Sequence, residues 1–246
     1  MLPKNCYIAG TGNLALALGE HIQSNKDYVF KGWISRNPSA AGINPVCAYD
    51  VEFEQDDWVF LCVPDRFISD AAKTLSSRGA KLIHCSGATA MQAGIDAVWW
   101  PMQTFSKEIQ SVWQQVPVFI ESPDEKLRKG LIHLAETTGG VPIIANSETR
   151  NAAHMAAVVA NNFSNAMYVF AGNILEEHGL SPALLKPIIK QTAEKVQAFS
   201  PTEVQTGPAI RNDQAVIEGH LELLKKQPVL QQLYKQISAA IQFLFK

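Results

Sequence analysis

The stretch Cys6-Tyr7-Ile8-Ala9-Gly10-Thr11-Gly12-Asn13-Leu14-Ala15 decides the fold. Its first four residues predict a short buried strand. Apolar residues continue beyond the glycines at helical spacing, at Leu16, Leu18 and Ile22, and predict a helix. A glycine-rich turn between a strand and a helix is typical of dinucleotide-binding folds.

Each residue of this turn has a physical role in such a fold. Gly10 permits the tight turn, Gly12 lets backbone N–H groups approach a diphosphate, and Ala15 is small enough for the helix to pack on the strand. The helix N-terminus adds unpaired N–H donors and partial positive charge. We therefore expect the diphosphate to bind at Gly10, Thr11, Gly12, Asn13 and Leu14. The alternative is an ordinary glycine-rich turn.

The end of the second predicted strand, Tyr28–Ile34, indicates which dinucleotide binds. A site for NAD places Asp or Glu there, roughly 20 residues beyond the glycines, to bond the ribose 2′-hydroxyl. This chain has Ser35, Arg36 and Asn37 instead. The guanidinium of Arg36 suits a 2′-phosphate, and its small polar neighbours can add hydrogen bonds. The sequence thus predicts NADP(H); the alternative is a solvated arginine after a strand.

Composition excludes several other classes of function. The 246 residues carry 21 Lys and Arg against 23 Asp and Glu, a net charge of −2, so no basic footprint for nucleic acid or an anionic membrane exists. The four cysteines form no C-x-x-C pair and predict reduced thiols in a cytoplasmic protein. We expect no leader before the first strand and no membrane span, since no apolar run reaches the ~18 residues that a span needs.

Apolar runs after the second strand alternate with connectors. We expect five further strands, at Trp58–Val63, Lys81–Cys85, Ala97–Trp100, Val116–Ile120 and Val141–Ile144. Strands alternating with helices predict an α/β fold, a doubly wound Rossmann-type parallel sheet over residues 1–146. Between Asn37 and Asp50 two prolines and a glycine leave room for at most one helical turn.

The composition changes after Asn146 and predicts a smaller all-helical C-terminal domain, residues 147–246. A long helix begins at Ser147 and stops at Gly179. Three more are expected at 184–199 (kinked by Pro187), 213–225 and 229–245. Apolar residues in excess of one bundle's needs predict a homodimer; the alternative is a monomer that buries them against its own sheet: Leu221, Leu224, Leu233, Ile237, Ile241 and Leu244.

Polar residues on the long helix are the first candidates for chemistry. Four of them share an arc of about 60° on an ideal helix of roughly 100° per residue: His154, Asn161, Asn165 and Tyr168. Such a stripe predicts a polar ligand, water or a partner helix opposite it. Hydride transfer to a C=N or C=O group requires a proton donor, and His154 is the best candidate. The alternative for His154 is a structural role.

Loops after the strands supply further candidates. Val63 ends a predicted strand, and Pro64 and Ser86 follow strands. All three are expected to contact the cofactor, because ligands bind beyond the carboxyl ends of strands. Ser86 and Thr104 can also position substrate or merely bond their own turns. Arg211 can hold an anionic group, whereas Asp213 is expected to cap a helix. No His or Cys spacing indicates a metal site.

Four motifs together resemble a known family: Ile8-Ala9-Gly10-Thr11-Gly12-Asn13-Leu14-Ala15, His84-Cys85-Ser86-Gly87, Pro101-Met102-Gln103-Thr104-Phe105-Ser106 and Thr206-Gly207-Pro208-Ala209-Ile210-Arg211-Asn212-Asp213. The chain resembles, over its whole length, a bacterial family of NADP oxidoreductases without an established substrate. In that family a Rossmann-like domain precedes a helical domain of unknown function. More distantly, the chain is similar to pyrroline-5-carboxylate reductase, deazaflavin-dependent NADP reductases and the 6-phosphogluconate dehydrogenase superfamily.

The resemblance implies NADP(H) binding at Gly10, Gly12, Asn13, Leu14, Ser35 and Arg36, and it marks His154 as typical of the family. Many relatives carry a histidine before the Pro-Met-Gln-Thr-Phe motif, where this chain has Trp100. The expected function is hydride transfer between NADP(H) and a small anionic imine or carbonyl metabolite, in a cleft between the domains. His154 would be general acid or base, with Asn161, Ser86, Thr104 and Arg211 positioning the substrate. The alternative is a non-catalytic NADPH sensor that acts through its helical domain.

Overall fold

The computed structural model describes residues 4–37, 46–76, 79–107, 109 and 112–245. They form two compact units, Met1–Ala160 and Asn161–Lys246, and each is described by itself. The predicted division near Asn146 remains a prediction. Asn146 is the N-cap of helix α4 (Ser147–Ala157), and its side chain accepts a hydrogen bond from the Thr149 N–H (2.9 Å).

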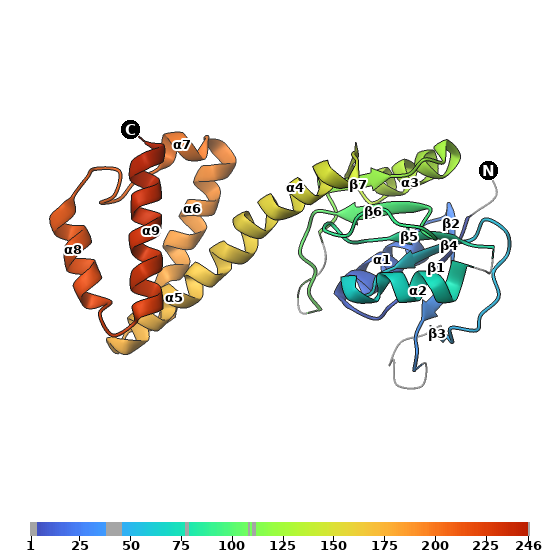
Figure 1. The fold of residues 1–246 in the computed structure, drawn as a ribbon, viewed down its shortest axis with the longest axis horizontal. Helices are drawn as coiled ribbons and strands as arrows, with labels where there is room; N and C mark the ends of the chain where they lie inside the picture. Colours follow the sequence, from blue (N-terminus) through green and yellow to red (C-terminus); the bar gives the residue numbers. More distant parts are fainter. Residues whose placement is uncertain (1–3, 38–45, 77–78, 108, 110–111, 246) are drawn as a thin grey trace. The chain divides into compact units, whose positions relative to one another are not determined.

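The first unit contains an eight-stranded sheet in the order β3-β2-β1-β4-β5-β6-β7-β8 (Figure 1). Its strands are β1 (Lys4–Ala9), β2 (Tyr28–Ile34), β3 (Val46–Cys47), β4 (Trp58–Leu61), β5 (Lys81–His84), β6 (Ala97–Pro101), β7 (Pro117–Glu121) and β8 (Val141–Ile144). Every neighbouring pair is parallel except β6 and β7. The predicted α/β sheet followed by a helical region is confirmed.

Two features of the sheet differ from the expectation. Strand β7 runs antiparallel to β6, because a loop joins them directly and an antiparallel return needs no crossover helix. The two-residue strand β3 pairs with the end of β2 and is too short to give an alternating pattern. The rest of the proline-containing segment, residues 38–45, lies outside the described residues.

Helices cover both faces of the sheet, and the alternation of side chains explains which residues meet them. Helices α1 (Asn13–Ser24) and α3 (Glu125–Thr137) pack on one face, where Trp99 is buried. Helix α2 (Ile68–Leu75) packs on the other, and Ala153 of α4 contacts Trp100 and Phe119 on that same face. Residues 99 and 100 are neighbours in sequence but point to opposite layers.

Small residues let tryptophans pack against helix backbones. A Cβ at Gly19 of α1 would lie 2.6 Å from the Trp33 ring, and the Trp33 indole N–H donates to the Ala15 carbonyl (3.2 Å). A Cβ at Gly130 of α3 would lie 2.7 Å from the Trp58 ring. These contacts fix α1 and α3 against the strands that position the loops described below.

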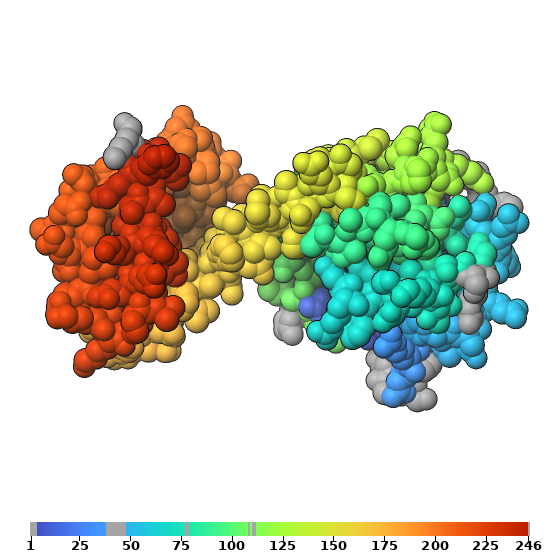
Figure 2. Space-filling model, viewed as in Figure 1, coloured from blue at the N-terminus to red at the C-terminus, as the bar shows by residue number. Residues whose placement is uncertain are grey.

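The second unit is helical: α5 (Ser164–Glu177), a 3₁₀ turn η5 (Pro182–Leu185), α6 (Lys186–Ala198), α7 (Pro201–Val204), α8 (Gln214–Leu223) and α9 (Pro228–Leu244) (Figure 1). Figure 2 shows the atoms of this unit in yellow to red. The predicted stop at Gly179 is confirmed, since its φ is +72° and the next N–H bonds back to Leu175 O (2.9 Å). Asp213 caps α8, as expected. The predicted kink at Pro187 is wrong, because this proline occupies the first turn of α6, where its missing N–H costs nothing.

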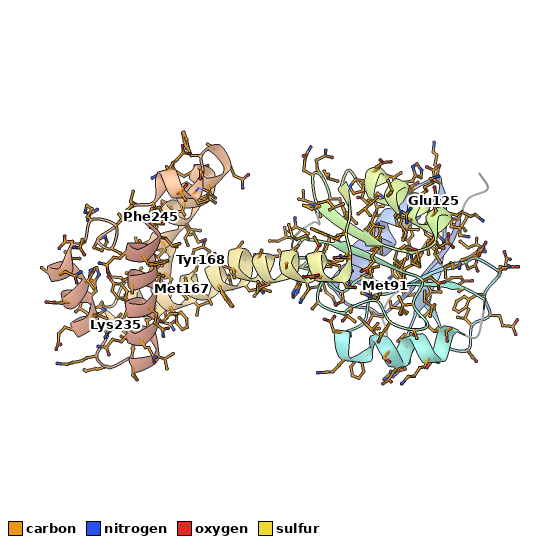
Figure 3. All side chains as sticks on the ribbon, turned by 45° about the horizontal axis from the view of Figure 1, so that its top comes forward. Met91, Glu125, Met167, Tyr168, Lys235 and Phe245 are labelled. Atoms are coloured by element: carbon orange, nitrogen blue, oxygen red, sulfur yellow. The ribbon has the colours of Figure 1, made fainter. Side chains whose placement is uncertain are left out.

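The long helix is interrupted by a π-helical segment, η4 (Val158–Phe163). Its i→i+5 hydrogen bonds widen the turn, so the helical period changes midway. The predicted single stripe from His154 to Tyr168 assumed α-helical geometry throughout and is therefore wrong. Asn161, Asn165 and Tyr168, the last labelled in Figure 3, are exposed in the chain.

Within the described residues, no helix has both the length and the hydropathy to cross a membrane. Cys6 and Cys85 are buried and Cys62 is half-buried, and all three are free thiols.

Candidate dinucleotide-binding site

Loops from five strands meet at one edge of the sheet. Strands β2, β1, β4, β5 and β6 are parallel, so their carboxyl ends lie at the same edge. The residues that follow them are those singled out by the sequence: Gly10–Leu14, Ser35–Arg36, Val63–Pro64, Ser86–Gly87 and Met102–Ser106. This edge is the position at which open α/β sheets bind ligands.

Backbone hydrogen bonds hold the turn at Gly10 between the ends of β1, β2 and β4. The Gly10 N–H donates to Ile34 O (3.1 Å), and the Cys62 N–H donates to Ala9 O (2.8 Å) beside it. Its φ is +124°, and a Cβ there would lie only 2.2 Å from Cys62 O. Because that neighbour is backbone, no other residue type fits this turn without distortion.

Gly12 leaves the N-terminus of α1 open. It is the N-cap of the helix, and no side chain caps the first N–H groups. The space around it is free, since a Cβ there would have no atom of the described residues within 4 Å. An uncapped helix N-terminus with free space in front of it fits a diphosphate, which needs N–H donors and positive partial charge.

The loop after β6 reaches across to the glycine-rich turn. The Asn13 side-chain amide donates to Phe105 O (2.8 Å), and the Phe105 ring lies 4.9 Å from the Trp113 ring. Thr104 in this loop is exposed, and its N–H bonds to the neighbouring Gln103 side chain (2.8 Å). The hydrogen bond from Asn13 therefore links the loop expected to hold the cofactor with the loop expected to hold substrate.

The guanidinium groups of Arg36, which follows β2, and of Arg66 both lie over the ring of Phe67. Arg36 lies 5.4 Å and Arg66 lies 4.8 Å from the centroid of the Phe67 ring. Burial raises the pKa of the Tyr49 hydroxyl, and the adjacent Arg36, which hydrogen-bonds to it, opposes that shift. In the described part of the chain neither arginine forms an ion pair.

Arg66 was not among the predicted site residues. It belongs to a short 3₁₀ turn, η2 (Asp65–Phe67), after β4, and β4 is separated from β2 by β1. Two cations held together without an acidic partner repel each other, and an anion bound between them relieves that repulsion. The half-buried Ser35 accepts a hydrogen bond from the Asn37 N–H (3.2 Å) beside this pair.

His154 of α4 lies against the loop after β5. Its ring centroid is 5.6 Å from that of Trp100, and a Cβ at Gly87 would meet both rings, at 2.7 Å and 2.6 Å. The imidazole is half-buried and retains access to solvent. Position 100 thus holds an indole in contact with the imidazole of His154.

Ser86 caps its own turn. Its hydroxyl accepts hydrogen bonds from the Thr89 N–H (2.9 Å) and the Ala88 N–H (3.2 Å), and the residue is 7% exposed. The hydroxyl proton remains able to donate to a ligand. Val63 is half-buried and its N–H lies 3.5 Å from the position of a Cβ at Gly10, while Pro64 is exposed.

A buried ion pair that the sequence analysis missed anchors α4. The Arg150 guanidinium, 1% exposed, pairs with the Glu121 carboxylate and donates to Thr89 O (2.5 Å). The Ser147 hydroxyl donates to the same carboxylate (2.9 Å) and accepts from the N–H of Met91, labelled in Figure 3 (3.0 Å). This network ties the helix that carries His154 to the connection between β5 and β6.

His84 is fully buried beneath this network. Burial, and secondly the charge of Arg150, lower its pKa to about 4, so the imidazole is neutral at physiological pH. Its Nδ1 accepts the Ser86 N–H (3.2 Å). This hydrogen bond supports the turn at Ser86.

The remaining predicted residues belong to the second unit. Asn161 lies in the π-helical segment and Arg211 in the turn before α8, and both are exposed. Among the residues described, no group of His, Cys, Asp or Glu is arranged to hold a metal ion.

Comparison with known proteins identifies the family. Residues 116–241 match the family described as a domain of unknown function, DUF2520, and because this is more than half of the chain, the chain belongs to that family. No protein with a curated function matches the sequence. The predicted resemblance is confirmed by solved structures.

A "putative NADP oxidoreductase" from Bacteroides fragilis is similar over 98% of both chains, with 29% identity and a TM-score of 0.85. A protein from Thermotoga maritima is similar over 98% of both chains, with 25% identity and a TM-score of 0.75. Pyrroline carboxylate reductase from Plasmodium falciparum, solved with NADP bound, covers 100% of both chains at 12% identity and a TM-score of 0.59. That last likeness is one of fold alone.

Proposed function

We propose that the protein is an NADP(H)-dependent oxidoreductase that transfers a hydride to or from a small anionic imine or carbonyl metabolite. The observation that carries this proposal is the open, uncapped N-terminus of α1 at Gly12, framed by the strained turn at Gly10. The similarity to an oxidoreductase from Bacteroides fragilis supports the same cofactor class.

The diphosphate would bind the backbone of Gly10, Thr11, Gly12, Asn13 and Leu14, with Val63, Pro64 and Ser86 completing the contacts. When bound, the nicotinamide supplies or accepts the hydride. The protein's own contribution is to orient the dinucleotide at the carboxyl edge of the sheet and to supply the accompanying proton.

The 2′-phosphate would be held by Ser35 and Arg36, and Arg66 joins them. Phe67 holds both guanidinium groups by cation–π contact, and neither has an acidic partner in the described residues. Removing one charge-assisted hydrogen bond costs about 1.5–3 kcal/mol. Replacing either arginine by alanine is thus expected to weaken NADPH binding about 10- to 150-fold and NADH binding far less.

His154 would serve as general acid or base, because its half-buried ring lies beside the turn at Ser86 and Gly87. Ser86, Thr104, Asn161 and Arg211 would position the substrate, with Arg211 binding its anionic group. The indole of Trp100 cannot transfer a proton, so no such role is assigned to position 100.

The test is hydride transfer from isotopically labelled NADPH to a panel of imines, keto acids and a deazaflavin. We expect label in one class of product, and a loss of about 100-fold or more in turnover for His154→Ala, within the usual range for general acid–base groups. Full turnover by that variant would refute the role of His154. Tight NADPH binding without transfer to any acceptor would favour the alternative, a non-catalytic sensor.

We also propose that the second unit forms a homodimer. Only six of its described residues are buried: Gly172, Ala209, Ile217, Leu224, Leu230 and Ser238. Large apolar side chains are exposed instead, including Phe163 at 57%, Leu184 at 62% and Phe243 at 75%. A solution mass of one chain, measured by light scattering, would contradict the proposal.

A further inference from the structure

A cavity lies at the opposite edge of the sheet from the candidate dinucleotide-binding site. It has a volume of about 540 Å³ and is bordered by the amino ends of β1, β2, β4 and β5 and by α3, whose first residue, Glu125, is labelled in Figure 3. Because these strands are parallel, the length of β1, roughly 15–20 Å, separates it from the glycine-rich turn. We call it the amino-edge cavity. Its size is within the range of small-molecule sites.

Contacts between acidic and basic side chains of different elements form the rim of the amino-edge cavity. Each of the three aspartates that line it has a basic partner that also lines it: His133–Asp27 (2.8 Å), Lys126–Asp56 (3.5 Å) and Lys81–Asp124 (3.6 Å). The rim is thus cross-linked, and each of these aspartates already has a partner.

Three hydrogen-bond donors in the cavity remain without an acceptor. Neither Lys4 nor Lys26 forms an ion pair within the described residues, and Lys4 Nζ lies 5.9 Å from the Trp58 ring centroid. The Tyr28 hydroxyl forms no hydrogen bond with any described residue. Burial raises the pKa of this hydroxyl, so it keeps its proton and remains a donor. Two ammonium groups and a phenol suit an anion.

The floor of the cavity is aromatic. The rings of Tyr28 and Trp58 lie 6.1 Å apart at an angle of 42° and are almost fully buried. Gly130 allows the indole this position, since a Cβ there would lie 2.7 Å from it. Aromatic rings pack well against tilted neighbours, so the floor favours a flat ring over a compact inorganic ion.

We propose that the amino-edge cavity binds a small aromatic anion, with Lys4, Lys26 and the Tyr28 hydroxyl holding the anionic group and the ring resting on Tyr28 and Trp58. This proposal is independent of the proposed oxidoreductase function, because the two sites share no residue and lie at opposite edges of the sheet.

The test is calorimetric titration of the full chain with phenyl phosphate, with and without saturating NADPH. We expect binding that NADPH leaves unchanged, and affinities at least about tenfold lower for phenol, which lacks the charge, and for inorganic phosphate, which lacks the ring. The double variant Lys4→Gln, Lys26→Gln is expected to weaken phenyl phosphate binding by about tenfold or more. Lys73→Gln on α2, an exposed lysine away from the cavity, is the matched control.

Nuclear magnetic resonance of the indole N–H groups locates the ligand. The Trp58 signal, assigned through Trp58→Phe, is expected to shift on addition of phenyl phosphate. No binding at about 10 millimolar, displacement by NADPH, or equal affinity of the double variant and the wild type would each overturn the proposal. Phenyl phosphate binding in a protein that does not bind NADPH would uphold the amino-edge cavity and refute only the oxidoreductase assignment.

Discussion

Replacing Gly10 by alanine tests the turn on which the candidate site depends. The backbone there has φ +124°, a conformation that costs other residues on the order of 1–3 kcal/mol. The new methyl group would also lie 2.2 Å from Cys62 O, and this backbone atom cannot move without disturbing the end of β4. We expect a loss of at least about 3 kcal/mol in unfolding free energy, or roughly 6–12 °C in Tm.

Gly12→Ala is the matched control. Its φ of −79° suits alanine, and nothing lies within 4 Å of the new methyl group, so we expect a loss below about 1 kcal/mol. That methyl group would nevertheless occupy the space for the diphosphate and weaken NADPH binding. Calorimetric unfolding and NADPH titration of both variants measure the contrast. A Gly10→Ala protein that unfolds at the wild-type temperature, or a Gly12→Ala protein that binds NADPH fully, would refute the reasoning.

Three further predictions concern the support of the site. First, His84 gains its proton near pH 6.5 in the unfolded chain but only near pH 4 in the folded protein. Lowering the pH through this window is therefore expected to remove about 3 kcal/mol of unfolding free energy. Denaturant titration measures this loss, which is expected to be absent in His84→Gln. Second, Arg150→Met breaks a buried ion pair and is expected to lower the unfolding free energy by about 3–5 kcal/mol. Lys129→Met breaks an exposed pair and is expected to lower it by less than about 1 kcal/mol. Equal losses would contradict this account. Third, Asn13→Ala removes the hydrogen bond to Phe105 O and is expected to speed amide hydrogen exchange in the loop after β6. Unchanged exchange in this loop would disprove the prediction.

Much of the fold follows from local sequence patterns. The apolar runs predict seven of the eight strands closely, because a parallel strand covered on both faces is apolar throughout. The glycines of the first turn also act locally: Gly10 is required by its own backbone angle, and Gly12 leaves the helix start open. The antiparallel β7 and the π-helical segment η4 could not be predicted this way, since both depend on hydrogen-bonding partners rather than on composition.

The candidate site shows the same division between local and distant causes. Arg36 could be predicted because residues directly after the second strand contact the ribose or its 2′-phosphate in dinucleotide-binding folds. Arg66 could not, because it meets Arg36 only through the order of strands in the sheet and their shared contact with Phe67. Arg150 could not be predicted either, because it stands in the polar first turn of α4, among Ser147, Glu148, Thr149 and Asn151, and its partner Glu121 comes from a strand 29 residues earlier.

Calorimetric titration of the wild-type protein and of the double variant Arg36→Ala, Arg66→Ala with NADPH and NADH tests the central claim most directly. We predict that the wild type binds NADPH at least about tenfold more tightly than NADH, and that the double variant loses this preference while still binding both. Equal affinity of the wild type for the two nucleotides would contradict the 2′-phosphate assignment. Failure to bind either at millimolar concentration would contradict the account of the glycine-rich turn itself.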